Sequence, residues 1–325
     1  MTRNLALDAI RVTEAAAVGA YAHMGQGDEE AADRAAVAAV SLSLGRLSVG
    51  GCVRIGEGIE NDVPDLYTGQ KVGNGEGPEV DIALMPLEGT SIMARGGFNA
   101  ISAVAFAESG GFLSVPAVYM EKISVGSSLP ADVIDIDATP QDNISNLAAE
   151  KNLKPTDLVI CILDRPRHKD LIEDVRTTGA GIRLIMDGDL SGAVAPVHAE
   201  SGIDMYMGIG LAPQGILTAA ALKCSGGQFQ GRLIARNSDD KDSLFRAGIE
   251  DASAIYTLET MISGDVVFAA TGITTGLLLP GVERSRYRHD GYTFTTHSMV
   301  LSSQSGTWRE VQSHHHSSGM SLSIP

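Results

Sequence analysis

The apolar and polar positions of the first 47 residues follow a helical pattern. The segment NLALDAIRVTEAAAVGAYAHMG is followed by a break at residues 25–27 and then by DEEAADRAAVAAVSLSLGRL. Asp28 stands directly before the second segment, where an aspartate side chain can accept a hydrogen bond from a free backbone N–H. The pattern therefore predicts two helices, with Asp28 as the N-cap of the second.

Residues 51–126 have the texture of β-structure. Short runs that contain Val and Ile are punctuated by glycine and proline, as in CVRIGEG, VDIALM, AISAVAFAE and VYMEKISVG. Runs of this kind are typical of strands.

From about Leu129 the texture changes to an alternation of the two patterns. ADVIDID, DLVICILD, GIRLIMDGD and GIDMYMGIG are strand-like, and they alternate with helix-like QDNISNLAAEKN, HKDLIEDVRTTG, LSGAVAPVHAES and PQGILTAAALKCSGG. Thr139 and Pro140 suit the N-cap and the first position of the first of these helices. The alternation predicts an α/β sheet with at least some parallel strands.

The last third of the chain is less regular. Residues 242–263 look mostly helical, DVVFAATGI and YTFTTHSMVLSS look like strands, and the polar residues 312–325 suggest a loose tail. We expect two lobes, an α+β lobe at residues 1–130 and an α/β lobe at residues 131–325. The segment after about residue 256 is a candidate to pack back on the first lobe.

The net charge and the hydropathy of the chain argue against some classes of binding partner. The net charge of −16 speaks against nucleic acid, because a phosphate backbone would be repelled. No apolar run approaches the ~18–20 residues needed to cross a bilayer, and the first residues are too acidic for a signal or transit peptide. We therefore expect a cytoplasmic protein without a membrane or nucleic-acid partner.

Candidate chemistry lies where predicted strands end. In open α/β sheets, sites form at the carboxyl ends of strands. Carboxylates are natural ligands of Mg²⁺ or Mn²⁺, and arginine forks grip phosphate. A single turn of this kind is more often an ordinary turn or a solvated loop than a site, so the prediction of metal-assisted phosphate chemistry depends on their joint order. The strand-end residues are Glu57, Glu88, Thr90, Arg165, Arg167, Asp187 and Asp189.

The joint order resembles the class II fructose-1,6-bisphosphatase family, whose cyanobacterial members also act on sedoheptulose 1,7-bisphosphate. The motifs are RVTEAAA, GDEEAADRAAV, IGEG, PLEGT, VYMEK, DRPRH, DGD, MGIGLAPQG and FAATGIT. The resemblance implies the layered α/β sugar-phosphatase fold shared with inositol monophosphatases, with Mg²⁺ or Mn²⁺ in a cleft between two lobes. It also implies a homo-oligomer, a dimer or tetramer, and a role in gluconeogenesis or the Calvin cycle.

The resemblance also implies roles for single residues. Asp33 and Glu57 correspond to ligands of one metal ion, and Glu88 to a ligand of another. Thr90, with Glu88 and Gly89, corresponds to the residues at the reacting phosphate, and its hydroxyl would orient the attacking water. The residues expected to hold the sugar and the distal phosphate are Tyr119, Arg165, Pro166, Arg167, Asp187, Gly188 and Asp189.

Four positions depart from the family pattern. Met85 and Gln214 stand where the family has an aspartate and a glutamate that bind metal, and Leu211 stands where it has a glycine near the substrate. Ile59 replaces a glutamate, for which the neighbouring Glu60 is a partial substitute at best. A thioether is a poor ligand for a hard cation, so the second metal site loses charge while the first is intact.

Two hypotheses about activity follow from this mixture. The first is a divalent-metal-dependent phosphatase that removes the 1-phosphate of a sugar bisphosphate, weakened by the changes. The second is a catalytically degenerate relative that binds a sugar phosphate or assembles with an active homologue. The retained residues favour the first hypothesis, and the clustered losses at Met85, Leu211 and Gln214 favour the second.

Overall fold

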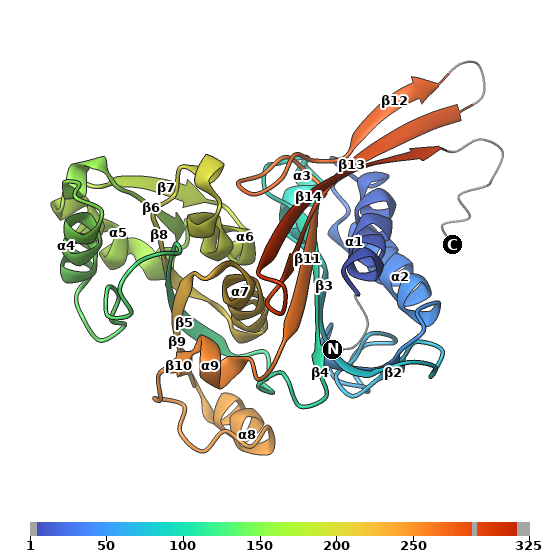
Figure 1. Ribbon diagram of the computed structural model, residues 1–325, viewed down its shortest axis with the longest axis horizontal. Helices are drawn as coiled ribbons and strands as arrows, with labels where there is room; N and C mark the ends of the chain where they lie inside the picture. The colour runs from blue at the N-terminus through green and yellow to red at the C-terminus, as the bar shows by residue number, and fades with distance from the viewer. Residues whose placement is uncertain (1–4, 288–290, 317–325) are drawn as a thin grey trace. The chain divides into compact units, whose positions relative to one another are not determined.

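The computed structural model describes residues 5–287 and 291–316 of the chain, which divides into two compact units. Unit 1 consists of Met1–Gly111 and Gly264–Pro325, and unit 2 of Phe112–Ser263 (Figure 1). These bounds differ from the lobes expected at residues 1–130 and 131–325, since strand β5 (Tyr119–Val125) pairs with strands of unit 2 on both sides.

Unit 1 contains an eight-stranded sheet with the order β12-β13-β11-β4-β3-β1-β2, in which β14 also pairs with β13. Only β1 and β3 pair in parallel within the described part of this sheet. The strands are β1 (Gly50–Ile55), β2 (Lys71–Val72), β3 (Glu79–Glu88), β4 (Ile101–Glu108), β11 (Val266–Gly272), β12 (Glu283–Tyr287), β13 (Gly291–Ser302) and β14 (Thr307–His316).

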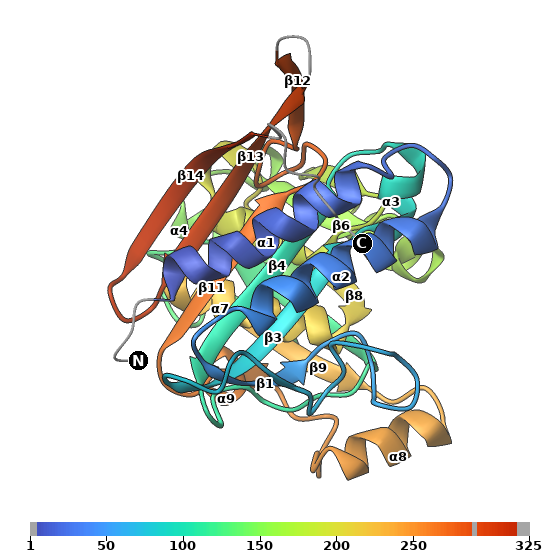
Figure 2. The ribbon, with the colours of Figure 1, turned by 90° about the vertical axis from the view of Figure 1, so that its right-hand side faces the viewer.

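Helices α1 (Ala6–Tyr21) and α2 (Glu29–Gly45) lie across one face of this sheet (Figure 2). Both predicted helices are thus confirmed. The Asp28 carboxylate accepts a hydrogen bond from the Ala31 N–H at 2.9 Å, as expected of an N-cap. Small residues on both helices, such as Ala16 and Ala32, are fully buried and let the helices approach the strands closely. A third, short helix, α3 (Thr90–Arg95), follows β3 directly.

Unit 2 contains a six-stranded sheet with the order β10-β9-β5-β8-β6-β7. Strand β6 runs parallel to β7 and β8, which confirms the prediction of parallel strands, while β5 is antiparallel to both of its neighbours. Besides β5, the strands are β6 (Val159–Leu163), β7 (Gly181–Ile185), β8 (Met205–Leu211), β9 (Gln228–Ile234) and β10 (Tyr256–Thr257).

Helices cover both faces of the unit 2 sheet (Figure 1). Ile123 and Met207 belong to a core with residues of α4 (Pro140–Glu150) and α5 (Lys169–Thr177). On the other face, the Ser124 hydroxyl donates to the carbonyl of Ala193 in α6 (Asp189–Val194). The remaining helices are α7 (Ala212–Ser225), α8 (Ser238–Arg246), α9 (Leu258–Met261) and the 3₁₀ turns Pro155–Asp157, Pro166–His168, Ala195–Val197 and Ala199–Ser201.

The predicted strand at residues 131–137 is wrong, because side-chain amides replace a partner strand there. Asn143 accepts from the Asp135 N–H and donates to the Asp135 carbonyl, each at 2.8 Å. Gln230 accepts from the Ile136 N–H at 2.7 Å and donates to the Ile134 carbonyl at 3.0 Å. The alternation of apolar and polar residues in this segment therefore reflects a loop with one buried side and not a strand.

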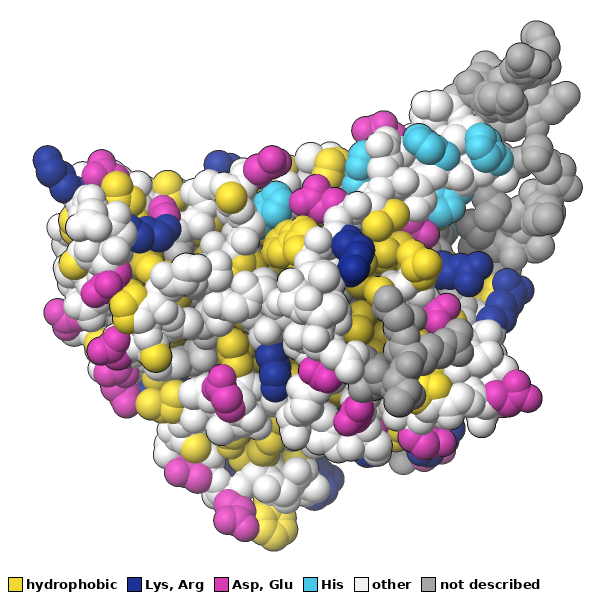
Figure 3. All heavy atoms as spheres, viewed as in Figure 1, with side chains coloured by type: hydrophobic (Ala, Val, Ile, Leu, Met, Phe, Trp, Pro, Cys, Tyr) yellow, Lys and Arg dark blue, Asp and Glu magenta, His cyan; other side chains and the backbone are white. Residues whose placement is uncertain are grey.

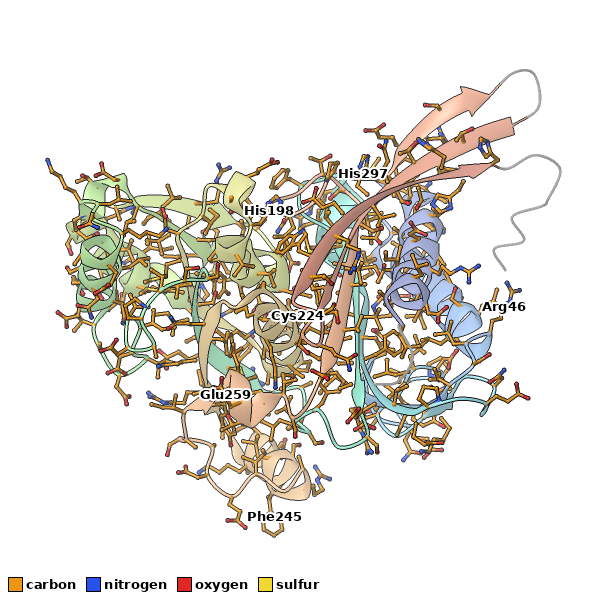
Figure 4. All side chains as sticks on the ribbon, in the orientation of Figure 1. Arg46, His198, Cys224, Phe245, Glu259 and His297 are labelled. Atoms are coloured by element: carbon orange, nitrogen blue, oxygen red, sulfur yellow. The ribbon has the colours of Figure 1, made fainter. Side chains whose placement is uncertain are left out.

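The helical prediction for residues 242–263 holds only at its two ends. Helix α8 stops because Gly248 takes a φ of +81° and the Ile249 N–H bonds back to the Leu244 carbonyl at 3.0 Å. Phe245, 81% exposed, projects from α8 into solvent (Figure 4).

The loose tail predicted for residues 312–325 is wrong over its first five residues. Residues Gln312–His316 pair with β13 as the end of β14, while residues 317–325 lie outside the described part of the chain. Histidine side chains accordingly gather on the face of unit 1 over β13 and β14 (Figure 3). Among the described residues, no helix combines the length and the apolar character that crossing a membrane requires.

Candidate active site

Asp33 and Glu57 form a pair of interacting carboxylates in unit 1. Asp33 lies in the second turn of α2, and Glu57 lies in the turn after β1, where its N–H bonds to the Leu66 carbonyl at 3.0 Å. Both side chains are half-buried, and within the described residues neither carboxylate has a hydrogen bond or an ion pair. The two negative charges are therefore held together without a protein cation between them.

The electrostatics of this pair favour a proton or a cation. Burial, reinforced by the charge of Asp33, raises the pKa of Glu57 to about 7. Burial also raises the pKa of Asp33, although the charge of Arg34 acts in the opposite direction. A divalent cation with oxygen ligands would relieve the repulsion between the carboxylates, so this donor pair fits a Mg²⁺ or Mn²⁺ ion.

The PLEGT turn is built by the end of β3. The pairing of β3 with β4 shifts register between Met85 and Glu88, in a stretch where Pro86 has no N–H to donate. Glu88 is 4% exposed and pairs with Ile101. Gly89 then takes a φ of +91°, a conformation that favours glycine, and this places Thr90 at the start of α3.

Met85 offers no ligand to a hard cation. It is half-buried beside the register shift of β3, and its thioether carries neither charge nor oxygen. No group of three or more His, Cys, Asp or Glu side chains is arranged to hold a metal ion within residues 5–287 and 291–316.

In unit 2, Tyr119 is flanked by residues from both neighbouring strands. As the first residue of β5, it stands opposite Leu211 of β8 and Ile234 of β9. The guanidinium carbon of Arg167 lies 5.0 Å from the centroid of its ring, and that of Arg236 lies 4.3 Å away. Two arginine side chains therefore lie beside the Tyr119 ring. Of these two, only Arg167 was predicted from the sequence.

The DRPR and DGD turns lie close together at the ends of β6 and β7. Arg165 Nη2 is 3.8 Å from Asp187 Oδ2, too far for a hydrogen bond but within ion-pair range. The Gly188 N–H donates to Asp187 Oδ1 at 2.9 Å, and the φ of +83° at Gly188 turns the chain into α6. Pro166 begins the 3₁₀ turn that carries Arg167.

A buried ion pair that the sequence did not reveal fixes two of the predicted substrate segments. Lys122, 1% exposed, donates to Asp189 Oδ2 at 2.6 Å and to the Leu211 carbonyl at 2.7 Å. Asp189 is also buried, and its Oδ1 has no hydrogen-bond partner within the described residues. Lys122 thereby ties the start of α6 to the turn between β8 and α7.

His168 fixes the arginine turn in a similar way. Its Nδ1 lies 2.7 Å from the Leu163 carbonyl, and its Nε2 accepts from the Ile209 N–H at 2.7 Å. Burial lowers the pKa of His168, which is consistent with a neutral ring that carries its proton on Nδ1. Arg167 donates through Nε and Nη2 to the carbonyl of the same Ile209, at 2.9 and 2.6 Å.

The two altered positions of unit 2 lie at the start of α7. Leu211 is 37% exposed and stands beside Tyr119, so its side chain adds bulk next to that ring. Gln214, half-buried, is the third residue of α7, and its Oε1 has no hydrogen-bond partner within the described residues. A buried oxygen of this kind is suited to accept from a ligand.

The predicted site residues thus divide between the units. Unit 1 holds the residues expected at the metal ions and the reacting phosphate, which are Asp33, Glu57, Met85, Glu88, Gly89 and Thr90. Unit 2 holds those expected at the sugar and the distal phosphate, together with Gln214 at the other altered metal position. The roles themselves stay predictions.

Lys122 and Arg236 were not predicted from the sequence. Nothing in the sequence of a single strand or loop shows that a lysine is buried or that an arginine stacks on a distant tyrosine.

Comparison with known proteins identifies relatives over almost the whole chain. Residues 3–315 match the family described as bacterial fructose-1,6-bisphosphatase, glpX-encoded. The chain is 38% identical to a D-fructose 1,6-bisphosphatase class 2/sedoheptulose 1,7-bisphosphatase of Synechococcus sp. (strain JA-2-3B'a(2-13)), covering 98% of this chain and 97% of the relative. Proteins of the same name from Synechococcus sp. (strain JA-3-3Ab) and Synechocystis sp. (strain ATCC 27184 / PCC 6803 / Kazusa) are each 37% identical, with 97% of each relative covered.

Glu57 is expected to make the stability of the metal-free chain depend on pH. Its pKa in the folded state is about 7, above the ordinary 4.5, so the folded chain binds more protons than the unfolded chain between these values. The stability contributed by protonated Glu57 is complete below pH 4.5 and is lost as pH rises through about 7. Urea unfolding between pH 4.5 and 8 should show this decline, and Glu57→Gln should flatten it. Glu60→Gln, at an exposed neighbour, should leave the decline unchanged. Parallel pH curves for the unmodified chain and Glu57→Gln would refute the assignment.

Removal of Lys122 is expected to destabilise the chain strongly. Lys122→Met leaves the buried Asp189 carboxylate without its cation, which should lower the free energy of unfolding by about 3 kcal/mol or more. Lys122→Met/Asp189→Leu removes both charges and should recover part of that loss. Lys151→Met, which breaks a more exposed pair with Asp204, should cost no more than about 1 kcal/mol. Denaturant titration decides between these values, and an equal small loss in both single variants would contradict the role given to Lys122.

Proposed function

The chain belongs to the family of glpX-encoded bacterial fructose-1,6-bisphosphatases, and on this basis we propose that it hydrolyses the 1-phosphate of fructose 1,6-bisphosphate with the help of a divalent metal ion. The observation that carries the proposal is the Asp33–Glu57 pair. Two interacting, half-buried carboxylates without an ion pair within the described residues have little structural use, whereas a divalent cation would stabilise them.

The bound metal would neutralise phosphoryl oxygens and promote ionisation of water. Asp33 and Glu57 would hold it, provided that Glu57 has lost its proton. Thr90, at the start of α3 beside Gly89, would orient the attacking water through its hydroxyl. Glu88 and Gly89 would line the reacting phosphate, and Glu88 would be the remaining carboxylate for a second metal ion.

The other end of the substrate would be held by the residues of unit 2. Arg165 and Arg167 are suited to a phosphate, because a guanidinium offers paired N–H donors to its oxygens. Tyr119 would contact the sugar phosphate beside them. Asp187, Gly188 and Asp189 would face sugar hydroxyls, and since Asp189 Oδ2 is bonded to Lys122, its Oδ1 is the oxygen available for this contact.

Catalysis is expected to be weakened. Met85 removes a charged oxygen ligand, Gln214 exchanges a carboxylate for an amide, and Leu211 adds a branched side chain beside Tyr119. Loss of charge-stabilising groups at a phosphoryl-transfer site costs about 3 kcal/mol, equivalent to roughly two orders of magnitude in rate.

These same three residues support a second candidate function. A chain that keeps Tyr119, Arg165 and Arg167 but lacks ligands for one metal ion is suited to bind a sugar phosphate without turnover. It would then act as a sensor or as a subunit beside an active homologue.

Three finer expectations accompany the proposal. We expect Mg²⁺ or Mn²⁺ as the metal ion, a homo-oligomer, either a dimer or a tetramer, and a cytoplasmic location. Sedoheptulose 1,7-bisphosphate, which the names of the relatives include, is the alternative substrate.

Phosphate release from fructose 1,6-bisphosphate with Mg²⁺ or Mn²⁺ tests the proposal. We expect slow turnover by the unmodified chain, none by Glu57→Ala, and a gain of about two orders of magnitude in Met85→Asp/Leu211→Gly/Gln214→Glu, because the lost ligands and space return.

Glu76→Ala, at an exposed glutamate of unit 1, is the matched control and should keep the unmodified rate. Turnover that survives Glu57→Ala would contradict the metal assignment. Turnover only after the triple substitution would instead establish the non-catalytic function.

A further inference from the structure

We propose that Arg236 is a further substrate-binding residue, which grips the distal phosphate of a sugar bisphosphate together with Arg167 beside the ring of Tyr119. The inference rests on the proposed function, in that the ligand is a sugar carrying a phosphate away from the reacting one. It adds a residue that the motifs of the sequence did not indicate.

Arg236 reaches the site from the end of β9. Ile234, the last residue of that strand, stands opposite Tyr119, and Arg236 follows two residues later. Its guanidinium carbon lies 4.3 Å from the Tyr119 ring centroid, closer than the 5.0 Å of Arg167. Both distances fall within the range of favourable cation–π contact, so both guanidinium groups lie beside the same ring.

Asp240 fixes the orientation of Arg236. Its Oδ2 accepts from the backbone N–H and from Nε of Arg236, both at 2.9 Å, and its Oδ1 lies 3.4 Å from Nη2. Asp240 is buried in the first turn of α8, where its own N–H is capped by Asn237 at 2.8 Å. The guanidinium is therefore held in place before any ligand arrives, which lowers the entropic cost of binding one.

The donors left over around Tyr119 point to an anion. Within the described residues, no hydrogen bond uses Nη1 of Arg236, Nη1 of Arg167 or the hydroxyl of Tyr119. Arg167 and Arg236 bring two positive charges and Asp240 one negative charge, so the cluster is cationic in a chain whose net charge is −16. Planar guanidinium forks match the oxygens of a phosphate better than those of a neutral sugar.

A purely structural contact makes a different prediction. If Arg236 only packs on Tyr119, its removal should lower stability without favouring one ligand over another. If it grips the distal phosphate, its removal should weaken every ligand that carries that phosphate and spare a ligand that lacks it. Because the contact would be made equally before and during the reaction, its removal should raise KM while leaving kcat nearly unchanged.

The test compares the binding of two sugar monophosphates by isothermal titration calorimetry at constant Mg²⁺. Fructose 6-phosphate carries the distal phosphate, and fructose 1-phosphate does not. For Arg236→Gln we expect the Kd of fructose 6-phosphate to rise about tenfold or more, as is typical for a lost charged hydrogen bond. The Kd of fructose 1-phosphate should stay within about twofold, a change too small for a lost contact of this kind.

Two further variants complete the experiment. Arg236→Lys keeps the charge but not the fork, so it should weaken fructose 6-phosphate binding by a smaller factor and decides the test if Arg236→Gln does not fold. Arg176→Gln removes an exposed arginine of α5 and should change neither Kd.

The proposal is overturned if the Arg236 variants bind fructose 6-phosphate as the unmodified chain does, if they weaken both ligands equally, or if the unmodified chain binds no fructose 6-phosphate. Failure of the proposed function has a different signature. In that case the unmodified chain releases no phosphate from fructose 1,6-bisphosphate, yet fructose 6-phosphate binding still depends on Arg236.

Discussion

The repulsion between two carboxylates is the interaction on which the proposed chemistry of unit 1 depends. Asp33 and Glu57 come from a helix and from the turn after a strand, and both are half-buried without a hydrogen bond within the described residues. Burial and the charge of Asp33 raise the pKa of Glu57 to about 7, so a proton would compete with a bound metal ion for the same oxygens near neutral pH. Metal binding should therefore strengthen as pH rises, and every catalytic role given to the PLEGT turn depends on a cation at this pair.

In unit 2, by contrast, a buried carboxylate is paired with a buried lysine. Lys122 compensates Asp189 inside the unit, while Arg165, Arg167 and Arg236 lie at turns nearer the surface, the first beside Asp187 and the last bonded to Asp240. The departures from the family affect neither the Asp33–Glu57 pair nor these arginines. Under the proposed roles, they would remove a metal ligand at Met85, weaken one at Gln214 and add bulk at Leu211. Such a chain is expected to keep its affinity for sugar phosphates while hydrolysing them slowly.

Local signals in the sequence were sufficient to predict where two helices begin. Asp28 and the Thr139–Pro140 pair mark helix starts that the structure has, since capping depends on neighbouring residues alone. Long-range contacts were not predictable in this way. Residues 131–137 resemble a strand, but Asn143 and Gln230 satisfy their backbone instead. A lysine in VYMEK gives no sign of a buried partner in DGD, and Arg236 meets Tyr119 only through the pairing of β5 with β9.

The number of metal ions bound per chain tests the central claim most directly. Mn²⁺ binding should be measured by equilibrium dialysis at pH 8, where Glu57, with its pKa of about 7, is largely ionised. We predict one tightly bound ion in the unmodified chain, none in Glu57→Ala, and a second ion only in Met85→Asp/Gln214→Glu. Two tightly bound ions in the unmodified chain, or one ion that persists in Glu57→Ala, would contradict this claim.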